Sequence, residues 1–390
     1  MSKTFPGSPS SAFDFQPLTR VVFGPGTLAR LGELTRDYGG SRILLVTDPG
    51  LEEVGHPQKA VAALRAAGLE VFLFDGVQEN PTTKTVTSGL AYAQKHAVDF
   101  IVAIGGGSAM DTAKGVNFLL TNGGVMQDYW GVGKATKPML PSIGVPTTSG
   151  TGSEAQSFAL ITDPVTHLKM ACGDKKVAFR VAILDPLLTL TQPQMVSVVT
   201  GIDAISHALE TYVTTKRSPL SQMCAREAWR LLEQNFPVVL QEPDNLPARA
   251  AMQWGAHLAG MAIENSMLGA THALANPLTA HYGMVHGHAI SLMLPHVIRF
   301  NAPMMTDSYR ELAEVSEIAF VSPQDAAEKV ANRVNELARE AGLPRRLAEC
   351  DVSREMLTVL ADEAAQQWTG KFNPRPVGYN ELLQLYEAAY

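Results

Sequence analysis

The chain has 390 residues, with 31 basic against 38 acidic side chains and a net charge of −7. Hydrophobic residues make up 46% and charged residues 18%, which is enough apolar material for large cores and excludes an intrinsically disordered protein. The acidic balance disfavours a nucleic-acid partner, which usually needs a basic patch, and a chain longer than roughly 250–300 residues is expected to form two domains.

The N-terminal 20 residues lack the continuous apolar stretch of a secretory signal. No segment has the roughly 18 uninterrupted apolar residues of a membrane span. The three cysteines, Cys172, Cys224 and Cys350, are widely and irregularly spaced, which matches neither a disulfide framework nor a zinc ribbon. We therefore expect a cytoplasmic protein without a membrane partner.

The first half of the chain alternates short runs of branched and aromatic residues with helical stretches. Strands are predicted over 42–47, 69–74, 99–104, 142–146, 158–162 and 177–184. Helices are predicted over 58–67, 82–97 and 109–119. Strand–helix–strand repetition of this kind predicts βαβ units and a parallel sheet.

After Pro186 the sequence becomes continuously helix-compatible, with proline and glycine between the segments. Helices are predicted over 196–214, 220–240, 248–268, 308–320, 324–341 and 379–389. The sequence thus predicts an α/β domain over residues 1–187 and an all-helical domain over residues 188–390.

A glycine turn follows the third predicted strand. Gly105, Gly106, Gly107 and Ser108 lead directly into a helical segment. Glycines let the backbone approach a ligand, and a helix N-terminus offers free N–H groups, so the turn favours a pyrophosphate site. It is not the standard dinucleotide fingerprint, because Met110 stands where that motif has glycine or alanine. The alternative is a tight turn with Ser108 as a helix cap.

Two further segments have side chains suited to a nucleotide. Asp48 ends the first predicted strand, where a carboxylate can bind the ribose 2′-hydroxyl of NAD and repel the extra phosphate of NADP. Asp-Pro-Gly is equally a good turn sequence. In the 146–154 loop, seven of nine residues are glycine or carry a hydroxyl group, which suits phosphate and ribose but also an ordinary surface loop.

The histidines are concentrated in the second half, where six of the ten lie between residues 257 and 296. Asp203 and His207 are four residues apart in a helical context, on one face, where they can share a metal ion. His272 and His286 lie on separate helical pieces. Together the four side chains offer an N/O shell that suits Fe(II) or Zn(II) better than magnesium.

Spacing alone leaves other interpretations of the histidines open. His281 and His288 belong to the same cluster and are alternative ligands. Without a metal, Asp203 and His207 would form a side-chain pair, and the other histidines would be satisfied within helix interfaces.

Seven motifs occur in order along nearly the whole chain. They are VFGPG at 22–26, NP at 80–81, GGGSAMDTAK at 105–114, PTTSGTGSE at 146–154, GIDAISHALE at 201–210, the 272–287 segment and NPR at 373–375. In this order they resemble the iron-containing (group III) alcohol dehydrogenases. Each motif is a modest signal, whereas the ordered set is highly specific.

The resemblance implies a Rossmann-like α/β dinucleotide-binding domain and an all-α metal-binding domain, in a dehydroquinate-synthase-like architecture. It implies an NAD-linked enzyme acting on CH–OH donors, with hydride transfer between the nicotinamide C4 and a metal-bound alkoxide or carbonyl. The implied ligands of a divalent metal, Fe(II) with Zn(II) as the alternative, are Asp203, His207, His272 and His286. The implied cofactor contacts, with Asp48 favouring NAD over NADP, are Asp48, Gly105, Gly106, Gly107, Ser108, Thr147, Thr148 and Lys169.

The resemblance also bears on acid–base chemistry. His272 and Asp203 would act in catalysis through the metal. Many family members have a second histidine four residues after the third ligand, often given a proton-relay role, but here that residue is Asn276, which cannot act as a base near neutral pH. His281, five residues further on, is the candidate substitute or else a pocket-lining residue.

The expected partners are a small alcohol or carbonyl substrate and further copies of the chain, as a homodimer or larger homo-oligomer. A dehydroquinate-synthase-like lyase is an alternative, disfavoured because residues 201–290 lack the Lys and Arg cluster that phosphate-bearing substrates need. A metal-free maleylacetate-reductase-like enzyme is disfavoured because all four candidate ligands are present. A non-enzymatic NAD-binding scaffold would leave those ligands without a purpose.

Overall fold

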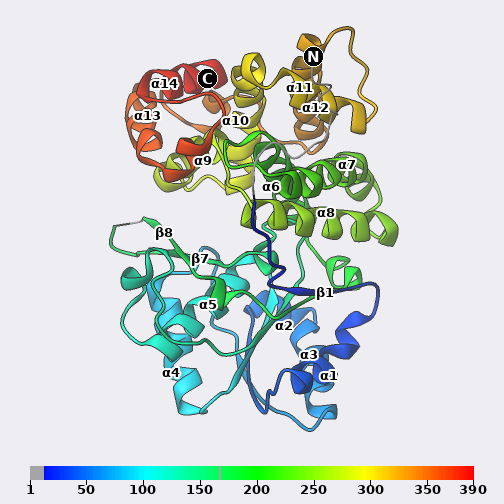
Figure 1. Ribbon diagram of the computed structural model, residues 1–390, viewed down its shortest axis with the longest axis vertical. Helices are drawn as coiled ribbons and strands as arrows, with labels where there is room; N and C mark the ends of the chain where they lie inside the picture. Colours follow the sequence, from blue (N-terminus) through cyan, green and yellow to red (C-terminus); the bar gives the residue numbers. More distant parts are fainter. Residues whose placement is uncertain (1–12, 167) are drawn as a thin grey trace. The chain divides into compact units, whose positions relative to one another are not determined.

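The computed structural model describes residues 13–166 and 168–390, which fall into two units. The sheet unit comprises residues Gln16–Pro193, and the helical unit comprises residues Gln194–Tyr390 together with the described residues 13–15. In Figure 1 the sheet unit runs from blue to green and the helical unit from green to red. The sequence predicted a boundary after residue 187, and the chain changes unit six residues later, where the first long helix begins.

A six-stranded sheet forms the centre of the sheet unit. Its order is β1-β9-β6-β4-β2-β3, and every neighbouring pair is parallel. The strands are β1 (Arg20–Phe23), β2 (Arg42–Val46), β3 (Glu70–Phe74), β4 (Phe100–Gly105), β6 (Ser142–Pro146) and β9 (Val181–Leu184). Every residue of β4 is buried, as expected of a central parallel strand covered on both faces. The predicted parallel sheet is confirmed.

Helices cover both faces of this sheet (Figure 1). They are α1 (Leu31–Asp37), α2 (Pro49–Glu53), α3 (His56–Ala66), α4 (Thr83–Lys95) and α5 (Gly107–Asn122). Because successive strand residues point to opposite faces, Ile43 and Leu45 pack into the core beneath α1 and α3. Leu44 and Val46 pack into the core beneath α4 and α5.

A small second sheet departs from the predicted arrangement. It has the order β5-β8-β7, with β5 (Gly131–Val132), β7 (Phe158–Thr162) and β8 (Lys169–Gly173). The predicted 158–162 strand forms, but it pairs antiparallel with β8 instead of joining the parallel sheet. The connection between the two strands is only six residues long, which suits a hairpin and is too short for a parallel crossover.

The last predicted strand of this unit is shorter than expected. The apolar run begins at Val177, but β9 begins at Val181. Asp174 accepts a hydrogen bond from the backbone N–H of Lys176 and thereby starts a 3-10 turn over Lys175–Val177. Val177, the first residue of the apolar run, belongs to this turn, so the strand begins four residues later than predicted.

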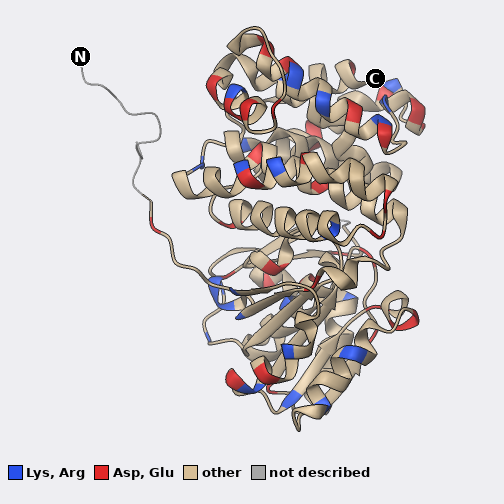
Figure 2. Cartoon of the chain, turned by 90° about the vertical axis from the view of Figure 1, so that its right-hand side faces the viewer, with Lys and Arg blue, Asp and Glu red and all other residues tan. Residues whose placement is uncertain are grey.

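Residues 194–390, all of which are described, form nine α-helices. They are α6 (Gln194–Val213), α7 (Pro219–Gln241), α8 (Leu246–Glu264), α9 (Ala270–Tyr282), α10 (His286–Asn301), α11 (Thr306–Val315), α12 (Pro323–Glu340), α13 (Leu357–Gln366) and α14 (Tyr379–Ala389). Acidic and basic residues are intermixed along these helices (Figure 2). Within the described residues, no helix is long and apolar enough to cross a membrane.

Polar caps fix where several of these helices begin. Ser218, Asn245 and Ser322 each accept a hydrogen bond from a backbone N–H in the first turn of α7, α8 and α12. A proline stands in the first turn after each cap, where its missing N–H costs nothing. The predicted starts of these helices therefore lie within two residues of the observed ones.

The three cysteines allow a first prediction. All are free thiols; Cys172 and Cys224 are buried and Cys350 is half-buried. Burial raises the pKa of Cys172 to about 12, so its thiolate fraction at pH 8 is on the order of 10⁻⁴. We expect iodoacetamide to label Cys350 first and to label Cys172 only after denaturation, as measured by peptide mass spectrometry. Equal labelling of Cys172 in native and urea-unfolded protein would contradict this burial.

Candidate functional site

Helix α6 presents three polar side chains on one buried face. Asp203, His207 and Glu210 follow one another at intervals of four and three residues, so their side chains stack along the same side of the helix. Each is at most 7% exposed. Buried polar groups of this kind need partners, and the helical unit supplies them from α9 and α10.

Three imidazoles surround one oxygen of Asp203. Its Oδ1 lies 3.4 Å from Nε2 of His207, 3.6 Å from Nε2 of His272 and 3.7 Å from Nε2 of His286. Ligands about 2.1 Å from a tetrahedral metal are separated by about 3.4 Å, so these spacings match a coordination shell. Donor atoms of Asp203, His207 and His272 all lie within 4.8 Å of one another, and His286 lies outside that group of three.

Oδ1 of Asp203 and Nε2 of His272 are both buried, and neither atom has a hydrogen-bond partner among the described residues. Buried polar atoms are nearly always satisfied, so two such atoms facing one another across 3.6 Å fit a cation that contacts both. A donor set of one carboxylate and three imidazoles suits Fe(II) or Zn(II).

The charges in the cluster also favour a cation. Burial alone would raise the pKa of Asp203, but the surrounding imidazoles of His207, His272 and His286 outweigh it and lower this pKa. Burial alone would lower the pKa of His272, but Glu210 and Asp203 raise it to about 9. His272 therefore lies where a positive charge is stabilised, either a proton or a metal ion that replaces it.

Glu210 is a functional candidate that the sequence analysis did not single out. One of its carboxylate oxygens lies 2.5 Å from Nδ1 of His272, and the other accepts a hydrogen bond of 2.6 Å from the backbone N–H of Thr271. A carboxylate behind a ligand histidine is a common second partner at metal sites. The available signal was its position on the same helix face as Asp203 and His207.

Helix α10 approaches α6 closely enough to exclude any side chain at one position. A Cβ atom on Gly287 would lie 2.2 Å from the carbonyl oxygen of Val199 and 2.7 Å from its Cα. Gly287 directly follows His286, so this contact positions a candidate ligand against the helix that carries Asp203.

Gly287→Ala is expected to lower the free energy of unfolding by about 1–3 kcal/mol, because the backbone cannot yield without moving a helix. Urea denaturation followed by circular dichroism measures this. Gly370→Ala is the matched control, since the nearest atom to its new Cβ is 3.5 Å away. Equal stability of the two variants would contradict the close approach.

In the sheet unit, Asp48 lies beside the glycine turn. Strands β2 and β4 are neighbours, so the residues after their carboxyl ends meet at one edge. A Cβ on Gly105, whose φ is +152°, would lie 3.5 Å from Oδ2 of Asp48. Asp48 also caps α2 by accepting a hydrogen bond from the backbone N–H of Leu51. The carboxylate of Asp48 therefore caps helix α2 and also lies beside the glycine turn, so both interpretations of this residue are compatible with the structure.

The threonine-rich loop packs on the same glycines. The backbone N–H of Thr147 donates to the carbonyl of Gly105, and a Cβ on Gly106 would lie 3.4 Å from Thr148. A Cβ on Gly107 would lie 2.8 Å from Thr151. Helix α5 begins at Gly107 with Gly106 as its cap, so Ser108 lies inside the helix and is not the cap that the alternative interpretation required.

A buried lysine clamps this loop to α5. Lys114 donates from Nζ to the carbonyl and hydroxyl oxygens of Ser153 and to the carbonyl oxygen of Phe158, at 2.7, 2.9 and 2.8 Å. The Ser153 hydroxyl in turn donates to Asp111, one turn before Lys114 on α5. Lys169, by contrast, is exposed at the start of β8, and its Nζ donates to Oδ1 of Asn80, 3.4 Å away.

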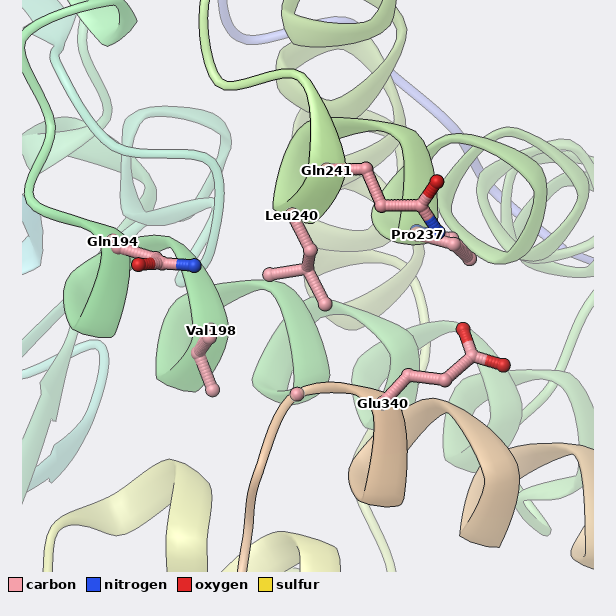
Figure 3. Close-up of a pocket in the computed structure, with 7 residues that line it drawn as sticks. Gln194, Val198, Pro237, Leu240, Gln241 and Glu340 are labelled. Atoms are coloured by element: carbon pink, nitrogen blue, oxygen red, sulfur yellow. The ribbon is translucent and has the colours of Figure 1, made fainter.

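A pocket of about 120 Å³ lies elsewhere in the helical unit, between the ends of α6, α7 and α12 (Figure 3). It is lined by Gln194, Val198, Pro237, Leu240, Gln241, Glu340 and Ala341. None of these residues belongs to the cluster around Asp203, so the pocket is separate from the candidate site.

Family models match almost all of the chain. The model for iron-containing alcohol dehydrogenase matches residues 18–186, and the C-terminal model for the Fe-containing alcohol dehydrogenase family matches residues 197–390. The chain belongs to the iron-containing alcohol dehydrogenase family. The predicted resemblance is thereby confirmed.

Individual members of this family are similar over their full length. The 1,3-propanediol dehydrogenase of Klebsiella pneumoniae is 34% identical, over 97% of this chain and 99% of that protein. The NAD-dependent methanol dehydrogenase of Bacillus methanolicus is 33% identical, over 94% and 97%. The crystal structure of a 1,3-propanediol oxidoreductase has a TM-score of 0.94 and 34% identity, covering 97% of this chain and 100% of that one.

As a member of the iron-containing alcohol dehydrogenase family, the chain has Asn276 at the position where a relay histidine was expected. Asn276 lies one turn after His272 on α9 and donates to the side-chain oxygen of Gln367. The structure does not bring His281 into the cluster around Asp203. Its Nε2 lies 2.8 and 2.9 Å from the two carboxylate oxygens of Glu363 on α13. His288, the other alternative ligand, also lies outside the compact group of three.

Proposed function

We propose that the chain is a metal-dependent, NAD-linked alcohol dehydrogenase that interconverts a small alcohol and its aldehyde or ketone. The convergence of three imidazole nitrogens on one oxygen of Asp203 is the observation that carries this proposal. Family membership fixes the reaction class.

The proposed metal ligands are Asp203, His207, His272 and His286, with Fe(II) as the metal and Zn(II) as the alternative. When bound, the ion supplies Lewis-acid polarisation of the substrate oxygen, and NAD supplies the hydride acceptor. Asp203 contributes the one negative charge of the donor set, which lowers the net charge of the occupied site. Buried helix α6 holds Asp203 and His207 rigidly, so little reorganisation is needed on binding.

The proposed NAD contacts lie in the sheet unit. Asp48 accepts a hydrogen bond from the ribose 2′-hydroxyl, and the turn at 105–108 with the N-terminus of α5 binds the pyrophosphate. Thr147, Thr148 and Lys169 are the remaining proposed contacts. NAD dependence is part of the name of the methanol dehydrogenase relative, which supports NAD over NADP here.

Proton transfer is proposed without a histidine base. Asn276 has no basic atom, and the ring of His281 is engaged by Glu363. The proton released from an alcohol would then leave through water. His281 is therefore not among the residues proposed to act in the reaction.

Elemental analysis of freshly purified protein, combined with a screen for NADH formation, tests this function. Iron or zinc near one equivalent is expected, with absorbance at 340 nm rising for some member of a series of short alcohols, diols, lactaldehyde-type substrates and hydroxy acids. Protein that binds neither metal after anaerobic reconstitution, or that reduces no NAD with any substrate, would contradict the proposal.

The proposed assembly is a homodimer or larger homo-oligomer, and the proposed location is the cytoplasm. Light scattering on purified protein tests the first, and a mass of one chain, 41.9 kDa, would contradict it. Fractionation of the source cells tests the second.

A further inference from the structure

We infer that Glu210 is a positioning residue that fixes which nitrogen of His272 carries a proton, and thereby sets the affinity of the site for its metal. This inference rests on the proposed function, because it takes His272 as a ligand. It concerns a residue that binds neither metal nor substrate and acts through His272 alone.

Two donors face the carboxylate of Glu210. Glu210 is 5% exposed, so its two oxygens depend on protein partners. One oxygen accepts from the backbone N–H of Thr271, which can only donate. The other oxygen lies 2.5 Å from Nδ1 of His272. A carboxylate is a much weaker base than an imidazole, so the Glu210 side chain is the ionised partner in this contact and its oxygens only accept.

It follows that Nδ1 of His272 carries its proton. In a neutral imidazole the other nitrogen then has the free lone pair. That nitrogen, Nε2, is the atom 3.6 Å from Oδ1 of Asp203 and has no hydrogen-bond partner among the described residues. Glu210 therefore directs the lone pair of His272 into the cluster of candidate ligands.

Glutamine cannot replace glutamate in this arrangement, although it has the same shape. Its side chain has one accepting oxygen and one donating NH₂ group, whereas two donors face it. If the NH₂ group faces Nδ1, the ring proton must move to Nε2, where it blocks the metal. If the NH₂ group faces Thr271, two donors meet at the first turn of α9.

The start of α9 has a second side-chain acceptor, Asn373. A variant of this residue can therefore show the effect of disturbing the helix start without changing the proton on His272. Asn373 accepts from the backbone N–H of Ala270 through Oδ1, at 3.3 Å, and exchanges hydrogen bonds with Asn301 on α10. A Cβ on Gly269 would lie 3.1 Å from both this oxygen and Oε1 of Glu210. Asn373 thus holds the same helix start as Glu210, but its side-chain hydrogen bonds go to Ala270, Asn301 and Arg375 and not to His272.

The test compares Glu210→Gln with the matched control Asn373→Ala. Each metal-stripped variant is titrated with Zn(II) against a chromophoric chelator, and thermal unfolding is recorded in parallel. We expect Glu210→Gln to raise the dissociation constant for Zn(II) by roughly 10- to 100-fold. Asn373→Ala should lower the unfolding temperature but change the dissociation constant by less than about threefold.

The outcomes separate this inference from the proposed function. Wild-type protein that does not bind Zn(II) would overturn the metal site itself. Tight binding by wild-type protein and by Glu210→Gln alike would overturn only the role of Glu210. Equal weakening in both variants would show that α9 placement, and not the proton on His272, controls affinity.

A measurement on the wild-type chain covers the case in which Glu210→Gln does not fold. In Zn(II)-loaded protein with ¹⁵N-labelled histidine, the His272 ring should carry its proton on Nδ1 and bind through Nε2. Comparison with His272→Gln assigns the signal. Coordination through Nδ1 would overturn the inference.

Discussion

Asp203→Asn is expected to lose the bound metal and NAD-linked turnover together. The substitution keeps the size of the side chain but removes the one charge around which His207, His272 and His286 converge. Lewis-acid stabilisation is worth several kcal/mol, and a loss of about 4 kcal/mol corresponds to a roughly 10³-fold fall in kcat/KM. Metal content by mass spectrometry and initial rates of NADH formation measure the two effects.

The control for this variant is Glu233→Gln. Glu233 is also a buried carboxylate of the helical unit, but its partner is Arg333 on α12, at 2.6 Å. This change should cost stability and leave the metal content near that of the wild type. If Asp203→Asn kept stoichiometric metal and half of its activity, Asp203 would not be a ligand.

Asp48→Asn is expected to shift cofactor preference toward NADP. An ionised Asp48 would face the 2′-phosphate of NADP with a like charge, and such a pairing costs several kcal/mol. Removing the charge should raise the ratio of kcat/KM for NADP to that for NAD by roughly 100-fold. Asparagine is an equally good helix cap, so the hydrogen bond to Leu51 at the start of α2 survives.

Glu53→Gln is the matched control for cofactor preference, because Glu53 carries the same charge on the same helix and is exposed. Its cofactor ratio should equal that of the wild type. A ratio that rises equally in both variants would assign the effect to the general charge of α2, and an unchanged ratio in Asp48→Asn would remove Asp48 from the ribose site.

Much of the parallel sheet could be predicted from the sequence because its strands are continuous apolar runs. Ile43 to Val46 and Ile101 to Ile104 are buried on both faces, which leaves no polar alternation to confuse the pattern. Strand β8 could not be predicted in this way. Its residues, Lys169–Gly173, include none that is branched at Cβ, and it forms because β7 offers a hydrogen-bonding edge.

Helices α9 and α10 were harder to delimit than their neighbours. Pro277 and Pro295 lie inside them, and a proline within a helical pattern usually marks an end. Both helices nevertheless continue past the proline, because tertiary packing buries Leu278 and Val297 beyond it. Local sequence preference was overridden here by burial.

For the site, local spacing and long-range contact contributed differently. Asp203 and His207 could be paired from helix geometry alone, since both lie on α6. The pairing of Glu210 with His272, 62 residues apart, depends on how α6 and α9 pack. The same limit applies to Lys114, whose partner Ser153 is 39 residues away. Helical periodicity relates residues within one helix but cannot name their partners on another segment.

The candidate ligands come from three helices, and this has a thermodynamic consequence. An ion held by α6, α9 and α10 cross-links segments that the unfolded chain leaves far apart, so metal binding and folding become linked equilibria. At a free metal concentration about one hundred times the dissociation constant, this linkage adds about 2.7 kcal/mol to the free energy of unfolding. Removing the metal with a chelator would thus abolish activity and also lower the unfolding temperature of the helical unit.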